Sequence, residues 1–282
     1  MAMKIAVLTM AYNEPVYLPI WARYYGQIVG AQNLFIIDHG STDDCMSQLP
    51  RAANIIRVPR SDAFDEAPRA ACVSSLQRAL LQYYDAVIYG DCDELIVPDP
   101  EIYNSLHDAV SASPLLTAPI GLHLFHATDR EGDLDYNRPI LEQRRYCAFT
   151  QAMCKPIITK SCVEWSMGFH SANSRPYYSK DIYLFHLKAM DVKGSLLRHA
   201  QNQNNNWSED SIIRNIGAHH RFDVQQFKSC FFDSYLHLLQ TNENCEFNFS
   251  EEVEAVERDE TGGHDRPAIR VAKIPDRFVG KF

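Results

Sequence analysis

Short apolar runs recur along the first 100 residues, and each predicts a strand; the first, at residues 4–9, has the pattern of a strand buried on both faces of a sheet. The runs cover residues 4–9, 33–38, 54–58 and 86–90. Between them, apolar residues recur at helical spacing, first at Tyr17, Trp21, Tyr24 and Ile28 and then at Val73, Leu76, Leu80 and Tyr84. This alternation predicts an α/β fold with a doubly wound, mostly parallel sheet.

The pattern becomes less regular after Pro100. Residues 115–126 predict one strand that Gly121 interrupts, and residues 154–158 predict a short edge strand because Pro156 lies inside it. Residues 165–170 and 181–187 have the pattern of two arms of a hairpin.

The segment 201–206 is polar and of low complexity, and it predicts either a mobile loop or a helix-interrupting insert. We expect a single catalytic domain over residues 1–250, with a nucleotide-binding half at 1–100 and an irregular acceptor half at 101–250. Residues 251–282 are charged and contain proline, and we expect a C-terminal arm with helical and extended parts.

Asp91, Cys92, Asp93 and Glu94 follow the fourth predicted strand directly. A strand that ends in two carboxylates places hard oxygen ligands at the carboxyl edge of the sheet, where open α/β sheets bind their ligands. Two carboxylates so close together repel, and a divalent cation relieves that repulsion while keeping positions for water and phosphate oxygens. The alternative is a solvated Asp-x-Asp turn.

Composition narrows the classes of partner. The chain has 282 residues, is 46% hydrophobic and carries a formal net charge of −9. Because no run of Lys and Arg stands out, a nucleic-acid backbone is not expected as a partner. A phosphate-bearing substrate in this negative field needs a cation or local Arg and Lys side chains.

The eight cysteines form no Cys-x-x-Cys pair, which argues against a zinc ribbon and favours free thiols in a reducing compartment. We expect no transmembrane segment and no signal peptide, because no apolar run is long enough and a strand begins almost at once. The expected location is cytoplasmic. A lipid-linked acceptor would bring the protein to the inner face of the membrane as a peripheral partner.

The chain resembles glycosyltransferases of the GT-A fold, and most of all the family 2 enzymes and the related group with an Asp-x-Asp-Glu-Phe motif. Three stretches in order carry the resemblance: Leu8-Thr9-Met10-Ala11-Tyr12-Asn13-Glu14, Ile36-Ile37-Asp38-His39-Gly40-Ser41-Thr42-Asp43-Asp44 and Asp91-Cys92-Asp93-Glu94-Leu95-Ile96-Val97-Pro98. They span residues 4–98. His39 stands where many members have Asp or Asn, and Leu95 where the closer group often has Phe.

The resemblance implies a nucleotide-diphosphate sugar donor, with a UDP-sugar favoured, and Mn²⁺ or Mg²⁺ as cofactor. Asp91 and Asp93 would bind the metal, and Asp38 would lie near the base and ribose. The residues implied in donor binding are Thr9, Ala11, Tyr12, Asn13, Glu14, Asp38, Arg69, Asp91, Cys92, Asp93 and Lys188. A cation at the diphosphate lowers the barrier to departure of the leaving group.

A third metal ligand is expected from His186, after a late predicted strand, with His170 as the alternative. An inverting transfer needs a general base for the acceptor hydroxyl, and we expect Glu164, beside Trp165, in that role. Asp191 and Asp181 are the alternatives. Trp207, after the Asn-rich segment, is expected in an acceptor lid, unless that segment is a disordered insert.

The sequence therefore predicts a metal-dependent, inverting glycosyltransferase that acts on a growing surface glycan or glycolipid, in polysaccharide biosynthesis. Two other functions stay open. A nucleotidyltransferase uses a similar sheet, but its Gly-rich phosphate loop is missing between Thr9 and Pro15. A non-catalytic nucleotide- or glycan-binding module would not need the carboxylates of Asp91, Asp93 and Glu94.

Overall fold

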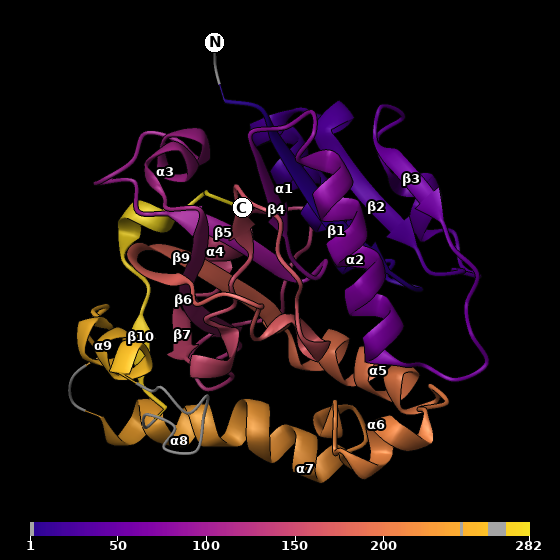
Figure 1. Ribbon diagram of the computed structural model, residues 1–282. Coiled ribbons are helices and arrows are strands. Elements are labelled where there is room, and N and C mark those ends of the chain that lie inside the picture. Colours follow the sequence, from indigo (N-terminus) through magenta and orange to yellow (C-terminus); the bar gives the residue numbers. More distant parts are fainter. Residues whose placement is uncertain (1–2, 243–244, 259–268) are drawn as a thin grey trace.

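A computed structural model describes residues 3–242, 245–258 and 269–282 (Figure 1). The described chain forms a ten-stranded sheet with the order β10-β7-β6-β8-β4-β1-β2-β3, while β9 pairs with both β5 and β6. The strands are β1 Ile5–Ala11, β2 Leu34–Asp38, β3 Asn54–Arg57, β4 Ala86–Tyr89, β5 Glu94–Pro98, β6 Leu116–Phe125, β7 Tyr146–Phe149, β8 Ile158–Thr159, β9 Tyr177–Ala189 and β10 Val271–Lys273.

Helices flank this sheet and cover one of its ends. They are α1 Tyr17–Val29, α2 Glu66–Leu80, α3 Leu106–Ala112, α4 Ile140–Gln143, α5 Val192–Gln203, α6 Glu209–Ile213, α7 Val224–Lys228, α8 Ser234–Thr241 and α9 Ser250–Arg258. In Figure 1 the helices α5 to α8 run along the lower end of the molecule. No helix within the described ranges combines the length and the apolar character that a membrane crossing requires.

The N-terminal half confirms the predicted α/β class. β3, β2, β1 and β4 are all parallel, and every residue of β1 is buried, as expected for a strand covered on both faces. The second set of helically spaced apolar residues, from Val73 to Leu80, lies in α2, which ends at Leu80. Asp65 caps the start of this helix, because its side chain accepts a hydrogen bond from the backbone N–H of Ala67.

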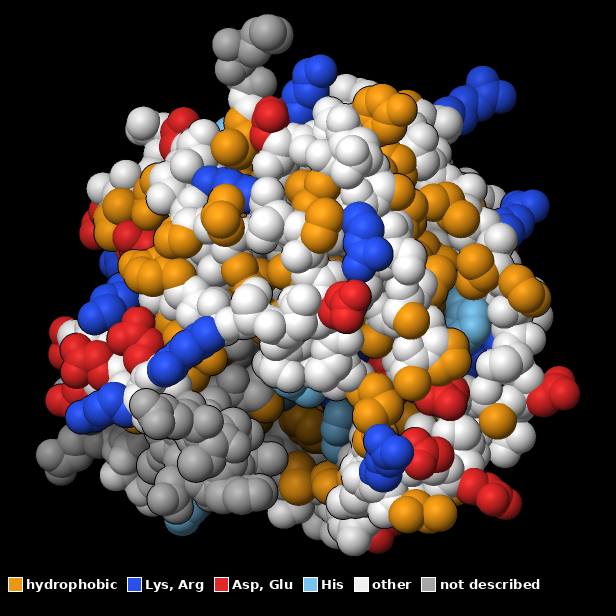
Figure 2. All heavy atoms as spheres, viewed as in Figure 1, with side chains coloured by type: hydrophobic (Ala, Val, Ile, Leu, Met, Phe, Trp, Pro, Cys, Tyr) orange, Lys and Arg blue, Asp and Glu red, His pale blue; other side chains and the backbone are white. Residues whose placement is uncertain are grey.

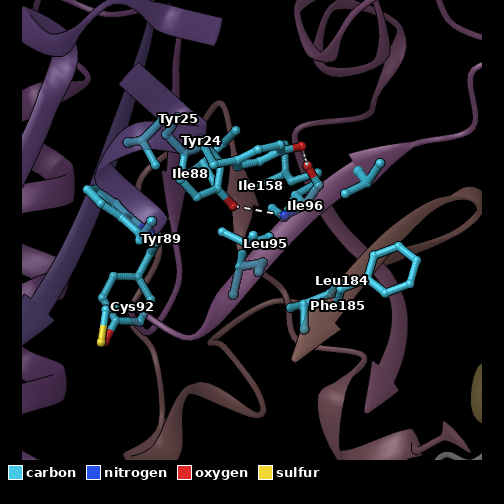
Figure 3. Packing of buried hydrophobic residues seen from close by; sticks show 14 of the residues in the cluster. Tyr24, Tyr25, Ile88, Tyr89, Cys92, Leu95, Ile96, Ile158, Leu184 and Phe185 are labelled. Atoms are coloured by element: carbon cyan, nitrogen blue, oxygen red, sulfur yellow. Dashed lines mark hydrogen bonds between the residues drawn. The ribbon is translucent and has the colours of Figure 1, made fainter. Parts of the chain in front are cut away.

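Two tyrosines of α1 hold the strand that follows the acidic segment. The Tyr24 hydroxyl donates to the carbonyl of Ile96 at 2.6 Å, and the backbone N–H of Ile96 donates to the Tyr25 hydroxyl at 2.9 Å. Figure 3 shows both side chains directed at Ile96 from the helix. These bonds satisfy backbone groups of β5 in the core, so the strand after Glu94 has a fixed position.

The second half is a mixed sheet, and there the predictions need correction. Residues 165–170 and 181–187 do not form a hairpin, because Trp165 only bridges Ala172 while β9 pairs with β5 and β6. The short strand predicted at residues 154–158 is β8, which begins only at Ile158, after Pro156, and lies between β4 and β6 rather than at the edge.

Gly121 does not interrupt its strand, since β6 runs through it. A side chain at this position would meet the backbone of Met153 at 2.3 Å, so glycine permits the close approach of the segment after β7.

The C-terminal arm contains the expected helical and extended parts. α9 packs on β9, and β10 pairs antiparallel with β7 at the edge of the sheet. Residues 259–268 of the predicted arm lie outside the described residues. Phe278 is fully buried, so the end of the chain belongs to the core.

Candidate active site

The acidic segment and the loop after β1 emerge at the same edge of the sheet. β4 and β1 are parallel neighbours, and the backbone N–H of Gly90 donates to the carbonyl of Leu8 at 3.2 Å. The turn that follows is closed by Glu94, whose carboxylate accepts from the backbone N–H of Asp91 at 3.2 Å. Parallel pairing therefore brings Glu14 and the Asp91–Glu94 turn together across about 80 residues of sequence.

A cavity of about 460 Å³ lies at this edge, between the parallel half of the sheet and the segment from α5 to the short 3₁₀ helix η5 (Ala218–His220). Its lining includes Ala11, Tyr12, Glu14, His39, Arg60, Arg69, Asp91, Cys92, Asp93, Glu94, Lys155, His170, His186, Lys188, Arg198, Trp207, His219 and His220. Most of the predicted donor and metal residues are thus gathered around one space. Its size suits a small-molecule substrate.

Asp91 is held between two cations. Its Oδ1 accepts hydrogen bonds from the Arg69 guanidinium and, at 3.1 Å, from the Tyr89 hydroxyl, while Lys155 Nζ lies 3.6 Å from Oδ2. Burial raises the pKa of Asp91, but the positive charges of Arg69 and Lys155 outweigh burial and hold the pKa at about 2. Asp91 is therefore a carboxylate at neutral pH.

Asp93 lies between His186 and Arg198. The same oxygen, Oδ2, contacts the Arg198 guanidinium and His186 Nε2, the latter at 3.1 Å. Burial raises the pKa of Asp93, yet Arg198 and His186 outweigh it, and the net pKa lies well below the usual value. Both carboxylates of the motif are thus ionised and face the cavity.

Glu14 completes the link to the loop after β1. Its Oε1 accepts from Arg198 Nε at 2.9 Å and from Arg198 Nη2 at 2.6 Å. Burial raises the pKa of Glu14 to about 7, and Arg198 offsets that only in part. One guanidinium from α5 therefore joins the first loop to the acidic turn.

Glu94 has its own buried partner. Lys155 Nζ donates to Glu94 Oε1 at 2.6 Å, and the Glu94 side chain is only 1% exposed. Lys155 comes from the short segment before β8, in the half of the chain that follows the predicted nucleotide-binding half. The two halves of the sequence thus share one charge network.

Three other polar side chains of the cavity lining, Lys188, His219 and His220, have no such pairing. Lys188 lies on β9 with its Nζ 4.6 Å from the centroid of the Phe231 ring, and no hydrogen bond or ion pair holds it within the described chain. Burial, with Arg198 nearby, lowers the pKa of Lys188 to about 7. The His219 and His220 rings also line the cavity, with their centroids 4.1 Å apart and their planes tilted, and neither ring has a hydrogen-bond partner among the described residues.

Two loops meet over the other end of the cavity. The Arg60 guanidinium lies 3.4 Å from the centroid of the Tyr12 ring and donates to Asn205 Oδ1 at 2.9 Å. The backbone N–H of Phe64 donates to the carbonyl of Asn206 at 2.6 Å, and the Phe64 and Trp207 rings pack at 4.9 Å. The Asn-rich segment is thus the end of α5 and a structured bridge, and Trp207 lines the cavity as expected of a lid.

Three predicted donor residues support the first loops and do not line the cavity. Thr9 is buried within β1. Asn13 Oδ1 accepts from the backbone N–H of Thr42 at 2.8 Å, and Asp38 accepts from the backbone N–H of Ser41 at 2.8 Å. Both bonds fix the loop after β2, which presents His39 to the cavity.

The prediction for the general base needs correction. Glu164 does not line the cavity; its side chain is 67% exposed and pairs with Arg78 of α2 at 3.2 Å. The alternatives are elsewhere too, since Asp191 caps α5 through Gly194 and Asp181 bonds Ser179. The ion pair with Arg78 holds Glu164 at the surface, outside the cavity.

His186 and His170 both line the cavity, but only His186 contacts the acidic motif. Nδ1 of His170 lies 2.6 Å from the carbonyl oxygen of Ala152 instead. Nowhere in the described ranges do three or more His, Cys, Asp or Glu side chains converge as a metal-binding group. At this site Arg198 contacts both Asp93 and Glu14.

Sequence reasoning missed Arg198 and Lys155, which are the main partners of the acidic motif. Neither belongs to a recognisable motif, and each lies more than 60 residues from the carboxylate it contacts. Only the requirement that buried carboxylates have partners signals that such cations exist.

No known family profile matches the chain, and no curated protein matches it. A crystal structure of a mycobacterial protein matches 46% of this chain and 44% of its own, with 18% identity and a TM-score of 0.31. Glucosyl-3-phosphoglycerate synthase from Mycobacterium tuberculosis, in complex with Mn²⁺, UDP-glucose and glycerol 3-phosphate, matches 46% and 47% with the same identity and TM-score. The match spans less than half of each of these proteins, and a likeness of this extent carries no argument about function.

Proposed function

We propose that this protein is a metal-dependent glycosyltransferase that moves a sugar from a nucleoside-diphosphate donor to a hydroxyl acceptor. The observation that carries the proposal is the pair of ionised carboxylates, Asp91 and Asp93, at the carboxyl end of β4 on the wall of a cavity. Ligands of open α/β sheets bind at this edge. The resemblance of the three sequence stretches to GT-A enzymes supports the same assignment.

The net charge of the carboxylates in the cavity lining and their ion-pair partners matches one divalent cation. Five carboxylates line the cavity (Glu14, Glu66, Asp91, Asp93 and Glu94), and their ion-pair partners are three cations (Arg69, Lys155 and Arg198), a difference of two negative charges when all are ionised. Asp91, Asp93 and His186 are the side chains we propose to hold Mn²⁺ or Mg²⁺. When bound, the cation would neutralise charge that develops on the departing diphosphate.

Arg198 would then exchange partners. The Arg198 guanidinium contacts Asp93 and Glu14 together. If Asp93 served as a metal ligand, Glu14 would be the carboxylate that still holds Arg198. A charged side chain freed from one carboxylate can turn toward donor phosphate oxygens in the same cavity.

The aromatic end of the cavity suits a nucleobase. Tyr12, His39, Phe64 and Arg60 line it, and planar rings and guanidinium groups stack on bases. We propose that the base of the donor, with UDP favoured, lies here beside Asp38 and the loop it supports. The sugar would then point toward the second half of the chain, where we propose that a glycan or lipid-linked acceptor binds. We propose that the protein acts in the cytoplasm, at the inner face of the membrane where the acceptor is lipid-linked.

Inversion of configuration remains part of the proposal and needs a proton acceptor at the cavity. Glu164 lies outside it. Burial raises the pKa of Glu14, which lines the cavity, to about 7, a value suited to a general base near neutral pH.

Thermal unfolding with UDP, GDP, CDP and dTDP, each with and without Mn²⁺, tests the proposal, because a ligand that binds only the folded state raises the midpoint. We expect one nucleotide to raise the midpoint only with Mn²⁺, and Asp93→Ala to abolish that rise. No rise with any nucleotide would contradict the proposed function. Metal-independent binding would favour the non-catalytic module.

A further inference from the structure

Three polar side chains on one wall of the cavity lack a protein partner, and they define a group that the donor site does not use. Lys188 is 9% exposed and faces the cavity without an ion pair or hydrogen bond in the described chain. The rings of His219 and His220 also line the cavity without one. Lys188 is buried while the two imidazoles are half-buried. Buried polar groups are nearly always satisfied, so a ligand is expected to supply the partner that the protein does not give Lys188.

These side chains lie together around one aromatic ring. Lys188 Nζ is 4.6 Å from the centroid of Phe231, and the His219 ring is 6.2 Å from the same centroid. The His220 ring contacts His219 in a tilted arrangement at 4.1 Å and stacks on Trp207 at 5.7 Å. Phe231 belongs to the π-helical segment Ser229–Asp233, so this group faces the C-terminal helices.

The carboxylate network cannot neutralise Lys188. Asp93 is already shared by Arg198 and His186, and Glu14 is bound by Arg198. The positive charge of Lys188 also acts on both neighbouring imidazoles, where it contributes to lowering the pKa of His219 and His220. A cluster of cationic and donor groups without a carboxylate of its own favours an anion over a neutral sugar hydroxyl.

Resting on the proposed glycosyl transfer, we propose that its acceptor carries an anionic group, a phosphate or a carboxylate, that is bound by Lys188, His219 and His220. The sequence places Lys188 among the donor-binding residues. The structure favours a separate anion instead, because the aromatic neighbours of Lys188 are Phe227 of α7 and Phe231 of the π-helical segment rather than residues of the donor loops. His219 of η5 (Ala218–His220) lies at the same Phe231 ring.

Isothermal titration with inorganic phosphate, acetate and neutral methyl glucoside tests this site, each on protein saturated with Mn²⁺ and the nucleoside diphosphate that stabilises it. We expect phosphate or acetate to bind in the presence of the nucleotide and methyl glucoside not to bind. The stronger of the two anions identifies the acceptor group. Lys188→Met should raise the Kd for that anion at least about tenfold, since a charged hydrogen bond is lost.

Two further variants keep the test decisive. His219→Gln with His220→Gln should weaken anion binding even if Lys188→Met does not fold. Lys193→Met removes an equal charge from α5, where Lys193 is 74% exposed and pairs with Asp133, and it should leave anion binding unchanged.

The outcomes separate this inference from the proposed function. If phosphate competes with the nucleotide and Lys188→Met weakens nucleotide binding, Lys188 belongs to the donor site and the inference is wrong while the glycosyltransferase stands. If an anion binds at Lys188 but no nucleotide binds, the proposed function fails and the anion site stands. If neither anion binds in the presence of the nucleotide, the inference is overturned.

Discussion

Carboxylates on the wall built by β1, β4 and α2 each have a cationic partner, whereas Lys188, His219 and His220, elsewhere in the cavity lining, have no hydrogen bond or ion pair within the described chain. We call the first group the paired wall and the second group the unpaired wall. The first wall is thus satisfied within the protein and fixed in geometry before a ligand arrives. The second wall keeps donors free for a ligand. The difference suggests that chemistry is organised on the first wall and that the partner molecule is selected on the second.

The strongest test of the paired wall is Asp93→Ala. This change removes a proposed metal ligand and the contact with Arg198 and His186, and we expect turnover to fall by about 10³-fold or more. Product formation from the nucleotide sugar that binds best measures it.

Asp99→Ala is the matched control, because Asp99 is also a buried carboxylate paired with an arginine, Arg277, at 2.9 Å but outside the cavity. It should destabilise the fold while folded protein keeps its turnover. Equal loss of turnover in both variants would show that Asp93 is only structural.

Lys155→Met tests whether pairing on this wall also holds the fold. Glu94 would lose its 2.6 Å partner while fully buried, and an uncompensated buried charge costs about 3–5 kcal/mol. Urea unfolding measures the loss. Lys193→Met, at an exposed ion pair, should leave the midpoint unchanged. A stable Lys155→Met protein would mean that Glu94 is protonated or that water reaches it.

The half-buried imidazole of His219 on the unpaired wall predicts that the folded protein loses stability as pH falls. Burial, followed by the charge of Lys188, lowers the pKa of His219 to about 2 in the folded protein. Because the folded pKa lies below the unfolded value near 6.5, neutral His219 favours folding above pH 6.5, and that contribution is lost as pH falls. Between pH 6 and 4, wild type should lose about 1 kcal/mol more per pH unit than His219→Gln.

Unfolding free energies at several pH values check this prediction. His107→Gln, on α3 and outside the cavity lining, is the control and should follow wild type. Identical pH dependence for wild type and His219→Gln would show that His219 is solvated and that the second wall is open to water.

The smallest effect is expected at Glu164. Its exposed side chain pairs with Arg78 away from both walls, so Glu164→Gln should leave turnover and donor affinity within about twofold of wild type. Steady-state kinetics measure both. A selective fall in kcat would restore Glu164 as the proton acceptor and require a rearrangement of residues 160–175.

The paired wall was largely predictable and the unpaired wall was not. β1, β2 and β4 are short, largely buried strands, so apolar runs and turn residues alone place Glu14 and Asp93 at one edge. The second half has long-range antiparallel and parallel pairings, as between β6 and β9, which local patterns do not encode. Arg198 and Lys155 reach the motif only through that tertiary structure.

Direct binding of Mn²⁺, followed by the electron paramagnetic resonance signal of the free ion, tests the central claim most directly. In the presence of the nucleoside diphosphate that stabilises the protein, the account predicts one Mn²⁺ bound per chain, and loss of that ion in Asp93→Ala but not in Asp99→Ala. Nucleotide-saturated wild-type protein that leaves all Mn²⁺ free would contradict the assignment of Asp91 and Asp93 as metal ligands.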